Sequence, residues 1–428
     1  MFKRLSLIAT FALSAAASAQ TTRPSSYKFD FGSGAAAPGY TQVLPTMAYD
    51  AERGFGFDSG PGLTASDRGG DPLKGDIISS DQPFFFSVAL PEGNYKVTAT
   101  FGDAQAATDN TVYAELRRLM VNQLKTKPGE FVTRTFIVNT RTPAIPGGGE
   151  VRIGGREKTS EIWAWDDRMS LEFNGSHPSI AALVIEPVDV PTVYILGDST
   201  VCDQPREPFN SWGQMLTGFL KPDIAVSNGA ESGDSIAPAL GARRFDKFWA
   251  QMKPGDYLLI QFGHNDMKST APNAIETYRN NMRRAVDETR AHGGTPVLIT
   301  SVSRRTFGPD GKITDSFKGY TQVVRDVAKE KSAPLIDLQN MGAAFYEAMG
   351  DEHSHVAFAT PAENTHHSDY GSYEIAKCVV MGIKANHLDL AKHIVDDFKD
   401  FDPSKPDSFD EFKIPKSPLS TNMTPLGS

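Results

Sequence analysis

The chain has 428 residues, more than one hydrophobic core normally organises, so we expect two domains. Its 43 lysine and arginine residues against 52 acidic residues give a formal net charge of −9, which argues against nucleic acid or an anionic membrane as a partner. Two cysteines, Cys202 and Cys378, are too few for a disulfide scaffold or a cysteine-based zinc cluster. One bridge between them and two separate buried thiols both remain open.

The N-terminus has the pattern of a secretory signal peptide. Lys3 and Arg4 precede an apolar run over residues 5–16, and Ala17-Ser18-Ala19 follows. We therefore expect residues 1–19 to be cleaved before Gln20 and the protein to be secreted or periplasmic. The remainder contains no markedly hydrophobic stretch, so no membrane insertion is expected.

Residues 20–188 consist of short predicted strands separated by clusters of Gly, Pro, Asn and Asp. The stretch 95–101 alternates polar and apolar residues with period two, which indicates a strand with one buried face. This half is predicted to be an accessory domain with an antiparallel β-sandwich fold. Its predicted strands are 27–31, 84–90, 95–101, 111–116, 131–138, 169–173 and 180–185.

After Pro191 the pattern changes to strands that alternate with amphipathic helices over residues 189–399. Continuous apolar strands between helices predict a parallel sheet covered on both faces. Residues 400–428 are rich in Pro and Ser and are predicted to be a tail that packs weakly or not at all. The predicted strands are 193–196, 225–227, 257–262, 296–300 and 335–338, and the helices are 212–220, 239–252, 275–292, 317–331, 341–349 and 370–385.

Polar residues that could form a catalytic centre follow the predicted strands. Ser199 lies just past the first strand, Gly233 follows the second and Asn265 follows the third, while Glu363 and His366 precede the last helix. Reactive groups gather at the carboxyl ends of parallel strands. A serine nucleophile requires a base, an acid that orients the base, and donors for the oxyanion. Their joint occurrence in this order predicts a serine hydrolase.

The pattern Gly-x-Ser-x-Gly of α/β-hydrolases is absent, because Gly197 precedes Ser199 but Val201 follows it. Instead, Gly197-Asp198-Ser199, Gly233, Gly263-His264-Asn265-Asp266 and the acid-x-x-His before Tyr370-Gly371 resemble the blocks of SGNH (GDSL-type) esterases. The stretches 211–214, 304–307 and 365–374 more closely resemble rhamnogalacturonan acetylesterases of carbohydrate esterase family 12.

This resemblance implies a flavodoxin-like, three-layer α/β domain of the SGNH-hydrolase type with a central parallel sheet. Bacterial members carry an N-terminal β domain that opens much like residues 27–32. The preceding β-sandwich is accordingly expected to be galactose-binding-like or jelly-roll-like.

By position, the resemblance makes Ser199 the nucleophile and His366 the general base and then general acid. Glu363 takes the place of the family's usual aspartate as the orienting acid. The backbone N–H groups of Ser199 and Gly233 and the side chain of Asn265 would form the oxyanion hole. No metal or organic cofactor is implied.

Three further residues are candidates for substrate contact. Asp234 stands where many relatives carry arginine. His264 either touches substrate or is a hydrogen-bonded structural residue. His367 has Asn364 three positions before it and lacks an orienting carboxylate, so it is interpreted as a pocket-lining or structural residue.

Two other patterns have a functional and a structural interpretation. Residues 351–355, which contain two histidines, could build a metal site with His366 and His367, or form a solvated loop beside the cleft. Trp163 and Trp165 could stack on sugars or pack in the sandwich core.

The sequence therefore predicts a secreted carbohydrate esterase that removes O-acetyl groups from pectic polysaccharide, namely rhamnogalacturonan. Its partner would be an acetylated plant cell-wall polysaccharide or oligosaccharide, and the protein would be a monomer or weak oligomer. The alternatives are a lipase-like or other esterase of the same superfamily, acting on another glycan or acyl ester, and a non-catalytic carbohydrate-binding protein. The deacetylated sugar position and the role of the β domain stay open.

Overall fold

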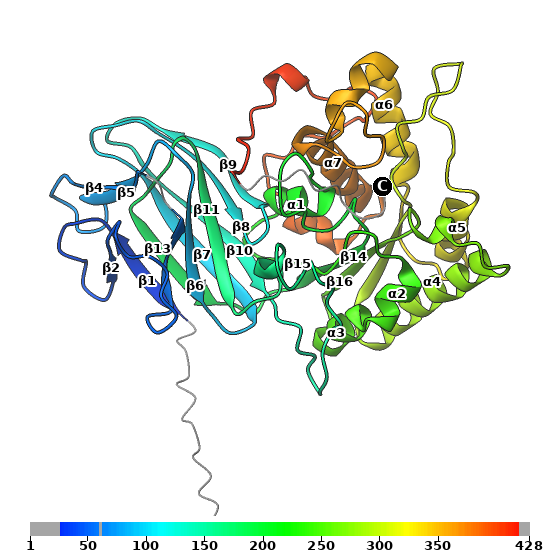
Figure 1. Ribbon diagram of the computed structural model, residues 1–428, viewed down its shortest axis with the longest axis horizontal. Coiled ribbons are helices and arrows are strands. Elements are labelled where there is room, and N and C mark those ends of the chain that lie inside the picture. Colours follow the sequence, from blue (N-terminus) through cyan, green and yellow to red (C-terminus); the bar gives the residue numbers. More distant parts are fainter. Residues whose placement is uncertain (1–25, 60–61, 419–428) are drawn as a thin grey trace, which may run out of the picture.

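The computed structural model describes residues 26–59 and 62–418. The predicted signal peptide lies outside these residues. A β-sandwich, coloured blue through cyan to green in Figure 1, lies beside an α/β domain coloured green to orange. The fold class predicted from the sequence is confirmed in both halves.

The β-sandwich consists of two five-stranded sheets with strand orders β10-β7-β13-β1-β2 and β3-β6-β11-β8-β9, and a small sheet β12-β5-β4. Its pairings are antiparallel except for β1 with β2. The strands are β1 (Tyr27–Phe31), β2 (Thr41–Val43), β3 (Phe55–Ser59), β4 (Thr64–Asp67), β5 (Asp76–Ser79), β6 (Phe84–Ala89), β7 (Gly93–Gly102), β8 (Thr108–Ala114), β9 (Arg118–Thr126), β10 (Phe131–Thr140), β11 (Arg168–His177), β12 (Ser179–Ile180) and β13 (Ala182–Pro187).

The alternation along β7 places Val97, Ala99 and Phe101 in the core between the sheets. Trp165 is also buried, and the guanidinium carbon of Arg141 lies 4.6 Å from its ring centroid. Trp163 is half-buried with its ring 5.6 Å from that of Phe85. For Trp165 the structure supports core packing over an exposed sugar-stacking surface.

The α/β domain has a parallel sheet with the order β15-β14-β16-β17-β18. The second strand, β15, pairs on one side of the first, β14, and the third, β16, pairs on the other side. The strand order therefore reverses between β14 and β16, and such a switch point leaves a crevice at the carboxyl ends. The strands are β14 (Thr192–Gly197), β15 (Ala225–Asn228), β16 (Tyr257–Gln261), β17 (Thr295–Ile299) and β18 (Leu335–Ile336).

Helices cover both faces of this sheet. Helices α1, α6 and α7 pack on the face that carries Val193 and Ile195, whereas α2 to α5 pack on the face of Tyr194 and Leu196. The helices are α1 (Trp212–Leu216), α2 (Ile236–Gly241), α3 (Arg244–Gln251), α4 (Ala274–Ala291), α5 (Tyr320–Glu330), α6 (Leu338–Ser354) and α7 (Asp369–Ala385), with 3₁₀ turns η1 (Ile162–Ala164), η2 (Thr217–Phe219), η3 (Asp266–Lys268), η4 (His355–Ala357), η5 (Asp389–His393) and η6 (Phe409–Glu411).

Two sequence predictions of local structure differ from the fold. The predicted helix 239–252 is two helices, because the backbone of Arg243 adopts a left-handed conformation with φ of 67° between α2 and α3. The prediction of a weakly packed tail is wrong for residues 400–418. Phe401 and Ile414 are buried, and the hydroxyl of Tyr113 donates to the carbonyl of Pro415 at 2.6 Å.

The two cysteines, whose pairing the sequence left open, are both free and buried. Sγ of Cys202 lies 3.2 Å from Oγ of Ser232. Burial raises the pKa of both thiols, so each is held as a neutral, weakly polar group.

Candidate active site

The end of β14 delivers Ser199 to the switch point of the sheet. Every residue of β14 is buried, and a Cβ atom on Gly197 would lie 2.6 Å from the carbonyl oxygen of Gln261 on β16. Glycine therefore permits the close approach of the two strands. The carboxylate of Asp198 then accepts hydrogen bonds from the backbone N–H of Thr200 at 3.0 Å and from its hydroxyl at 2.9 Å, which fixes the turn that presents Ser199.

Ser199 and His366 form a buried pair. Nε2 of His366 lies 2.8 Å from Oγ of Ser199, and the residues are 0 % and 1 % exposed respectively. His366 stands on the loop before α7, whose first turn is capped by the hydroxyl of Ser368 accepting from the N–H of Gly371. Nε2 can thus accept a proton from the hydroxyl without movement of the backbone.

Glu363 lies on the other side of the imidazole, with Oε2 3.3 Å from Nδ1 of His366. Its second oxygen accepts from the backbone N–H groups of Thr365 at 2.9 Å and Asn364 at 3.0 Å. Burial alone would raise the pKa of Glu363, but His366 and these N–H groups outweigh it and lower the pKa to about 2. The carboxylate is therefore ionised beside the imidazole across the working range of an enzyme.

Two of the predicted oxyanion donors lie on loops that contact each other, because Asn265 binds the residue that follows Gly233. Gly233 follows β15 and has φ of 82°, a conformation that strongly favours glycine. Within residues 26–59 and 62–418, the backbone N–H groups of Ser199 and Gly233 make no hydrogen bond. Nδ2 of Asn265 donates one hydrogen bond to the carbonyl of Asp234 at 2.9 Å, and its second hydrogen remains for another acceptor.

The three candidates for substrate contact are all engaged by the protein. Nδ1 of His264 lies 3.2 Å from the Asp198 carboxylate and the ring is 1 % exposed. Nε2 of His367 lies 2.6 Å from the hydroxyl of Tyr346, and burial together with His366 and His264 lowers its pKa to about 3. Asp234 forms an ion pair with Arg244, Oδ2 to Nε, at 3.2 Å. These placements favour a structural role for His264 and His367 over contact with a polymer.

Several residues that support the pair carried no recognisable sequence signal. The side-chain amide of Gln204 donates to the carbonyl of Ser199 at 2.6 Å. The ring of Phe209 stands edge-on to His366 with centroids 6.0 Å apart. Nε of Arg304 donates to the hydroxyl of Thr365 at 3.2 Å. Gln204 lies only five positions after Ser199, whereas only the finished fold brings Phe209 beside His366, which is distant in sequence.

Residues 351–355, the alternative metal segment, form the end of α6 and the start of η4. Nδ1 of His355 faces the carbonyl of Glu352, and Arg305 forms an ion pair with Asp351 at 2.8 Å. Over the part of the chain that the structure describes, no group of three or more His, Cys, Asp or Glu side chains is arranged to hold a metal ion. None of the helices in this part is long and apolar enough to cross a bilayer.

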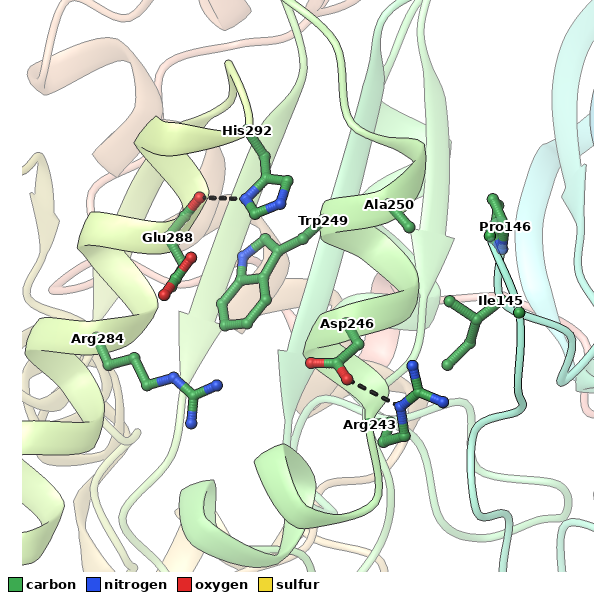
Figure 2. A pocket seen from close by; sticks show the side chains of 11 residues that line it. Ile145, Pro146, Arg243, Asp246, Trp249, Ala250, Arg284, Glu288 and His292 are labelled. Atoms are coloured by element: carbon green, nitrogen blue, oxygen red, sulfur yellow. Dashed lines mark hydrogen bonds and ion pairs between the residues drawn. The ribbon is translucent and has the colours of Figure 1, made fainter.

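A cavity of about 370 Å³ lies between α3, α4 and the loop around Pro146, and Figure 2 shows Trp249 and His292 among the residues that line it. Arg243 and Asp246 form an ion pair at its rim, drawn as a dashed line in Figure 2. Helices that follow parallel strands run back toward the amino ends, so this cavity lies away from the edge that carries Ser199. None of the catalytic candidates lines it.

The fold places Ser199, the candidate nucleophile, at the switch point of a parallel sheet and beside His366, as a serine hydrolase requires. Residues 195–371 match the GDSL-like lipase/acylhydrolase family, and residues 27–127 match the beta-agarase/YXIM esterase-like, galactose-binding domain-like family. The chain belongs to the GDSL-like lipase/acylhydrolase family and is a carboxylic ester hydrolase.

Similar proteins include rhamnogalacturonan acetylesterase RhgT of Bacillus subtilis, which is 36 % identical over 217 residues, covering 47 % of this chain and 94 % of the relative. The uncharacterized esterase YxiM of the same organism is 26 % identical over 377 residues, covering 85 % of this chain and 92 % of its own. The crystal structure of YxiM superimposes with a TM-score of 0.46 at 25 % identity, over 85 % of this chain and 99 % of that one.

Proposed function

We propose that this protein is a secreted carbohydrate acetylesterase that removes O-acetyl groups from pectic polysaccharide, namely rhamnogalacturonan. The observation that carries the proposal is the 2.8 Å contact between Nε2 of His366 and Oγ of Ser199, with ionised Glu363 behind the imidazole. The choice of substrate is supported by the 36 % identity to a rhamnogalacturonan acetylesterase. Export is supported by the signal-peptide pattern of residues 1–19.

In the first half of the reaction, Oγ of Ser199 attacks the acetyl carbonyl while His366 takes the hydroxyl proton on Nε2. Glu363 orients the ring through Nδ1 and stabilises the imidazolium that forms. His366 then donates the proton to the sugar oxygen, and the free sugar hydroxyl leaves behind an acetyl-serine.

In the second half, water gives a proton to Nε2 of His366 and attacks the acetyl carbonyl of the acetyl-serine. The bond from the carbonyl carbon to Oγ then breaks, His366 returns the proton to Oγ of Ser199, and acetic acid leaves and ionises to acetate. The negative charge on each tetrahedral intermediate is stabilised by the N–H groups of Ser199 and Gly233 and by the amide of Asn265. Because the two backbone donors make no hydrogen bond in the described protein, they need not break one to bind the oxyanion.

The experiment that tests the substrate is acetate release from a panel: acetylated rhamnogalacturonan, acetylated homogalacturonan, acetylated xylan and an aryl acetate. The proposal expects the highest kcat/KM on rhamnogalacturonan. If the protein hydrolyses the aryl acetate but acts on acetylated xylan as well as or better than on acetylated rhamnogalacturonan, it is an esterase and the proposed pectic substrate is wrong. No release from any member of the panel would reject the acetylesterase itself.

A further inference from the structure

The β-sandwich extends a buried turn into the catalytic domain. This turn joins β8 to β9, and Glu115 and Arg117 within it have φ of 56° and 61°. The Arg117 side chain is only 2 % exposed. Figure 1 shows β8 and β9 beside α1, at the boundary between the two domains.

Arg117 binds the loop that follows the nucleophile. Its Nη1 donates to the carbonyl of Phe209 at 2.8 Å, and its Nη2 pairs with Glu207. The next residue, Arg118, donates from Nε to Asp203 at 2.8 Å. Nη1 of Arg117 also lies 3.4 Å from the carbonyl of Gln204, so these two arginines of the β domain bind four residues of the loop 203–210.

This loop in turn contacts the nucleophile. Nε2 of Gln204 donates to the carbonyl of Ser199 at 2.6 Å, as described above. The carbonyl of Gln204 accepts from Nε2 of Gln214 at 2.9 Å, and the same amide donates to the carbonyl of Leu116 in the β-domain turn at 2.6 Å. A chain of hydrogen bonds through the side chains of Gln204 and Gln214 therefore connects Ser199 to the turn.

The same arginine also reaches the segment that carries the base. Nη2 of Arg117 donates to Oδ1 of Asp369 at 3.1 Å, and Nδ2 of Asn210 donates to the same oxygen at 2.7 Å. The N–H of Asn210 donates to the carbonyl of His367, the residue after His366, at 3.0 Å. Arg117 binds the backbone carbonyl of Phe209, and the ring of the same residue stands edge-on to the imidazole of His366.

We propose that Arg117 is a positioning residue for hydrolysis. Its guanidinium fixes the loop 203–210, which contacts Ser199, relative to the segment 366–369, which carries His366, so the β domain completes the active site. This inference rests on the catalytic roles proposed for Ser199 and His366. A planar guanidinium suits the task because it directs several N–H groups at fixed angles toward separate acceptors. Lysine keeps the charge but concentrates it at one atom.

If Arg117 only stabilised the contact between the domains, its removal would have a different effect on the protein. Its removal would lower the melting temperature because Glu207 and Asp369 would be left as buried charges without their cation. The molecules that remain folded would still react at the normal rate. Misplacement of reacting groups by about 1 Å can cost about 100-fold in rate, so a positioning role must slow the folded molecules themselves.

The test measures the reaction of Ser199 in the full-length protein well below its melting temperature. When an aryl alkylphosphonate reacts, Oγ of Ser199 forms a bond to phosphorus and the P–O bond to the aryl group breaks. The aryloxide leaves, and the hydroxyl proton passes to His366. This probe reports on the nucleophile whichever ester is the natural substrate. Its failure on the wild type would therefore reject the proposed catalytic site, whereas a difference between variants tests Arg117.

Arg117→Met is expected to slow phosphonylation, and to lower kcat on an aryl acetate, by about 10- to 100-fold with KM changed less than threefold. Arg117→Lys should recover part of the rate. The control is Arg68→Met, which breaks an ion pair with Asp103 inside the β domain and should react at the wild-type rate.

A triple variant removes the charges of Arg117, Glu207 and Asp369 together and tests the proposal if Arg117→Met alone does not fold. Arg117→Met combined with Glu207→Gln and Asp369→Asn also removes the two carboxylates that form ion pairs with the guanidinium, so neither is left as a buried charge without its cation. The proposal expects this triple variant to fold and to react at least tenfold slower than the wild type. A folded triple variant that reacts at the full rate would overturn the proposal and leave Arg117 with a purely structural role.

Discussion

Nε2 of His366 lies 2.8 Å from Oγ of Ser199, although 167 positions separate the two residues in the chain. The end of β14 supplies the serine, and the loop before α7 supplies the histidine. Because both side chains are almost fully buried, the hydrogen bond between them is poorly exposed to competing water. The pair is therefore arranged for proton transfer before substrate arrives.

The replacement of Ser199 by alanine removes the proposed nucleophile and only one oxygen atom. Acetate release from acetylated rhamnogalacturonan and from an aryl acetate is expected to fall below detection. The melting temperature should stay within a few degrees of the wild type, since only one oxygen atom is lost. Retained turnover at above about one hundredth of the wild-type rate would show that another group attacks the ester.

Glu363→Gln tests the orienting acid. The neutral amide keeps the size of the side chain but cannot stabilise an imidazolium, so kcat is expected to fall by about 10²- to 10⁴-fold with little change in KM. Glu363→Asp, which keeps a carboxylate but shortens the side chain by one methylene, should retain more activity than the glutamine variant. Glu352→Gln changes an exposed glutamate on α6 and serves as the control. Equal activity of Glu363→Gln and the control would remove Glu363 from the catalytic centre.

Asn265→Ala removes the side-chain donor proposed for the oxyanion hole. Loss of one such donor costs about 10²- to 10³-fold in kcat, because the charge on the tetrahedral intermediate loses a hydrogen bond. Steady-state kinetics on an aryl acetate measure the effect. Asn273→Ala, at an exposed asparagine before α4, should be unaffected. A loss under tenfold in Asn265→Ala would assign Asn265 to holding the Asp234 carbonyl.

The sequence was sufficient to predict that the candidate catalytic residues follow strands of one parallel sheet, and the reason is geometric. Ser199, Gly233 and Asn265 each follow a buried strand, and parallel strands end at one edge of a sheet. Local sequence patterns therefore predict that these three residues, which are far apart in the chain, lie at the same edge of the sheet. The sheet order β15-β14-β16, which makes this edge a switch point, required the structure.

The sequence was not sufficient to find the contacts between the domains. Arg117 looks like any surface arginine until the β8–β9 turn is docked against the loop 203–210. Likewise, the composition of residues 400–418 predicted a loose tail, yet Ile414 is buried and Pro415 accepts a hydrogen bond from the sandwich. Composition describes the chain itself and not the surface on which it packs.

His367 gives a prediction about stability and pH. Burial, with the neighbouring His366 and His264, lowers its pKa to about 3, whereas an unfolded histidine has a pKa of about 6.5. The folded state therefore favours the neutral ring, which can accept the hydroxyl proton of Tyr346 at Nε2. The stability that this preference contributes is complete above pH 6.5 and is lost as the pH falls from 6.5 toward 3.

His367→Gln is expected to flatten this acid-side decline, because glutamine does not titrate but can still accept from Tyr346. At pH 7.5 the variant should be less stable by about 1–3 kcal/mol, since the ring packing against Phe358 is lost. Urea unfolding of both proteins from pH 7.5 to 4 measures the difference, and the gap between them should narrow as the pH falls. A gap that stayed constant over this range would mean that His367 does not remain neutral in the folded protein.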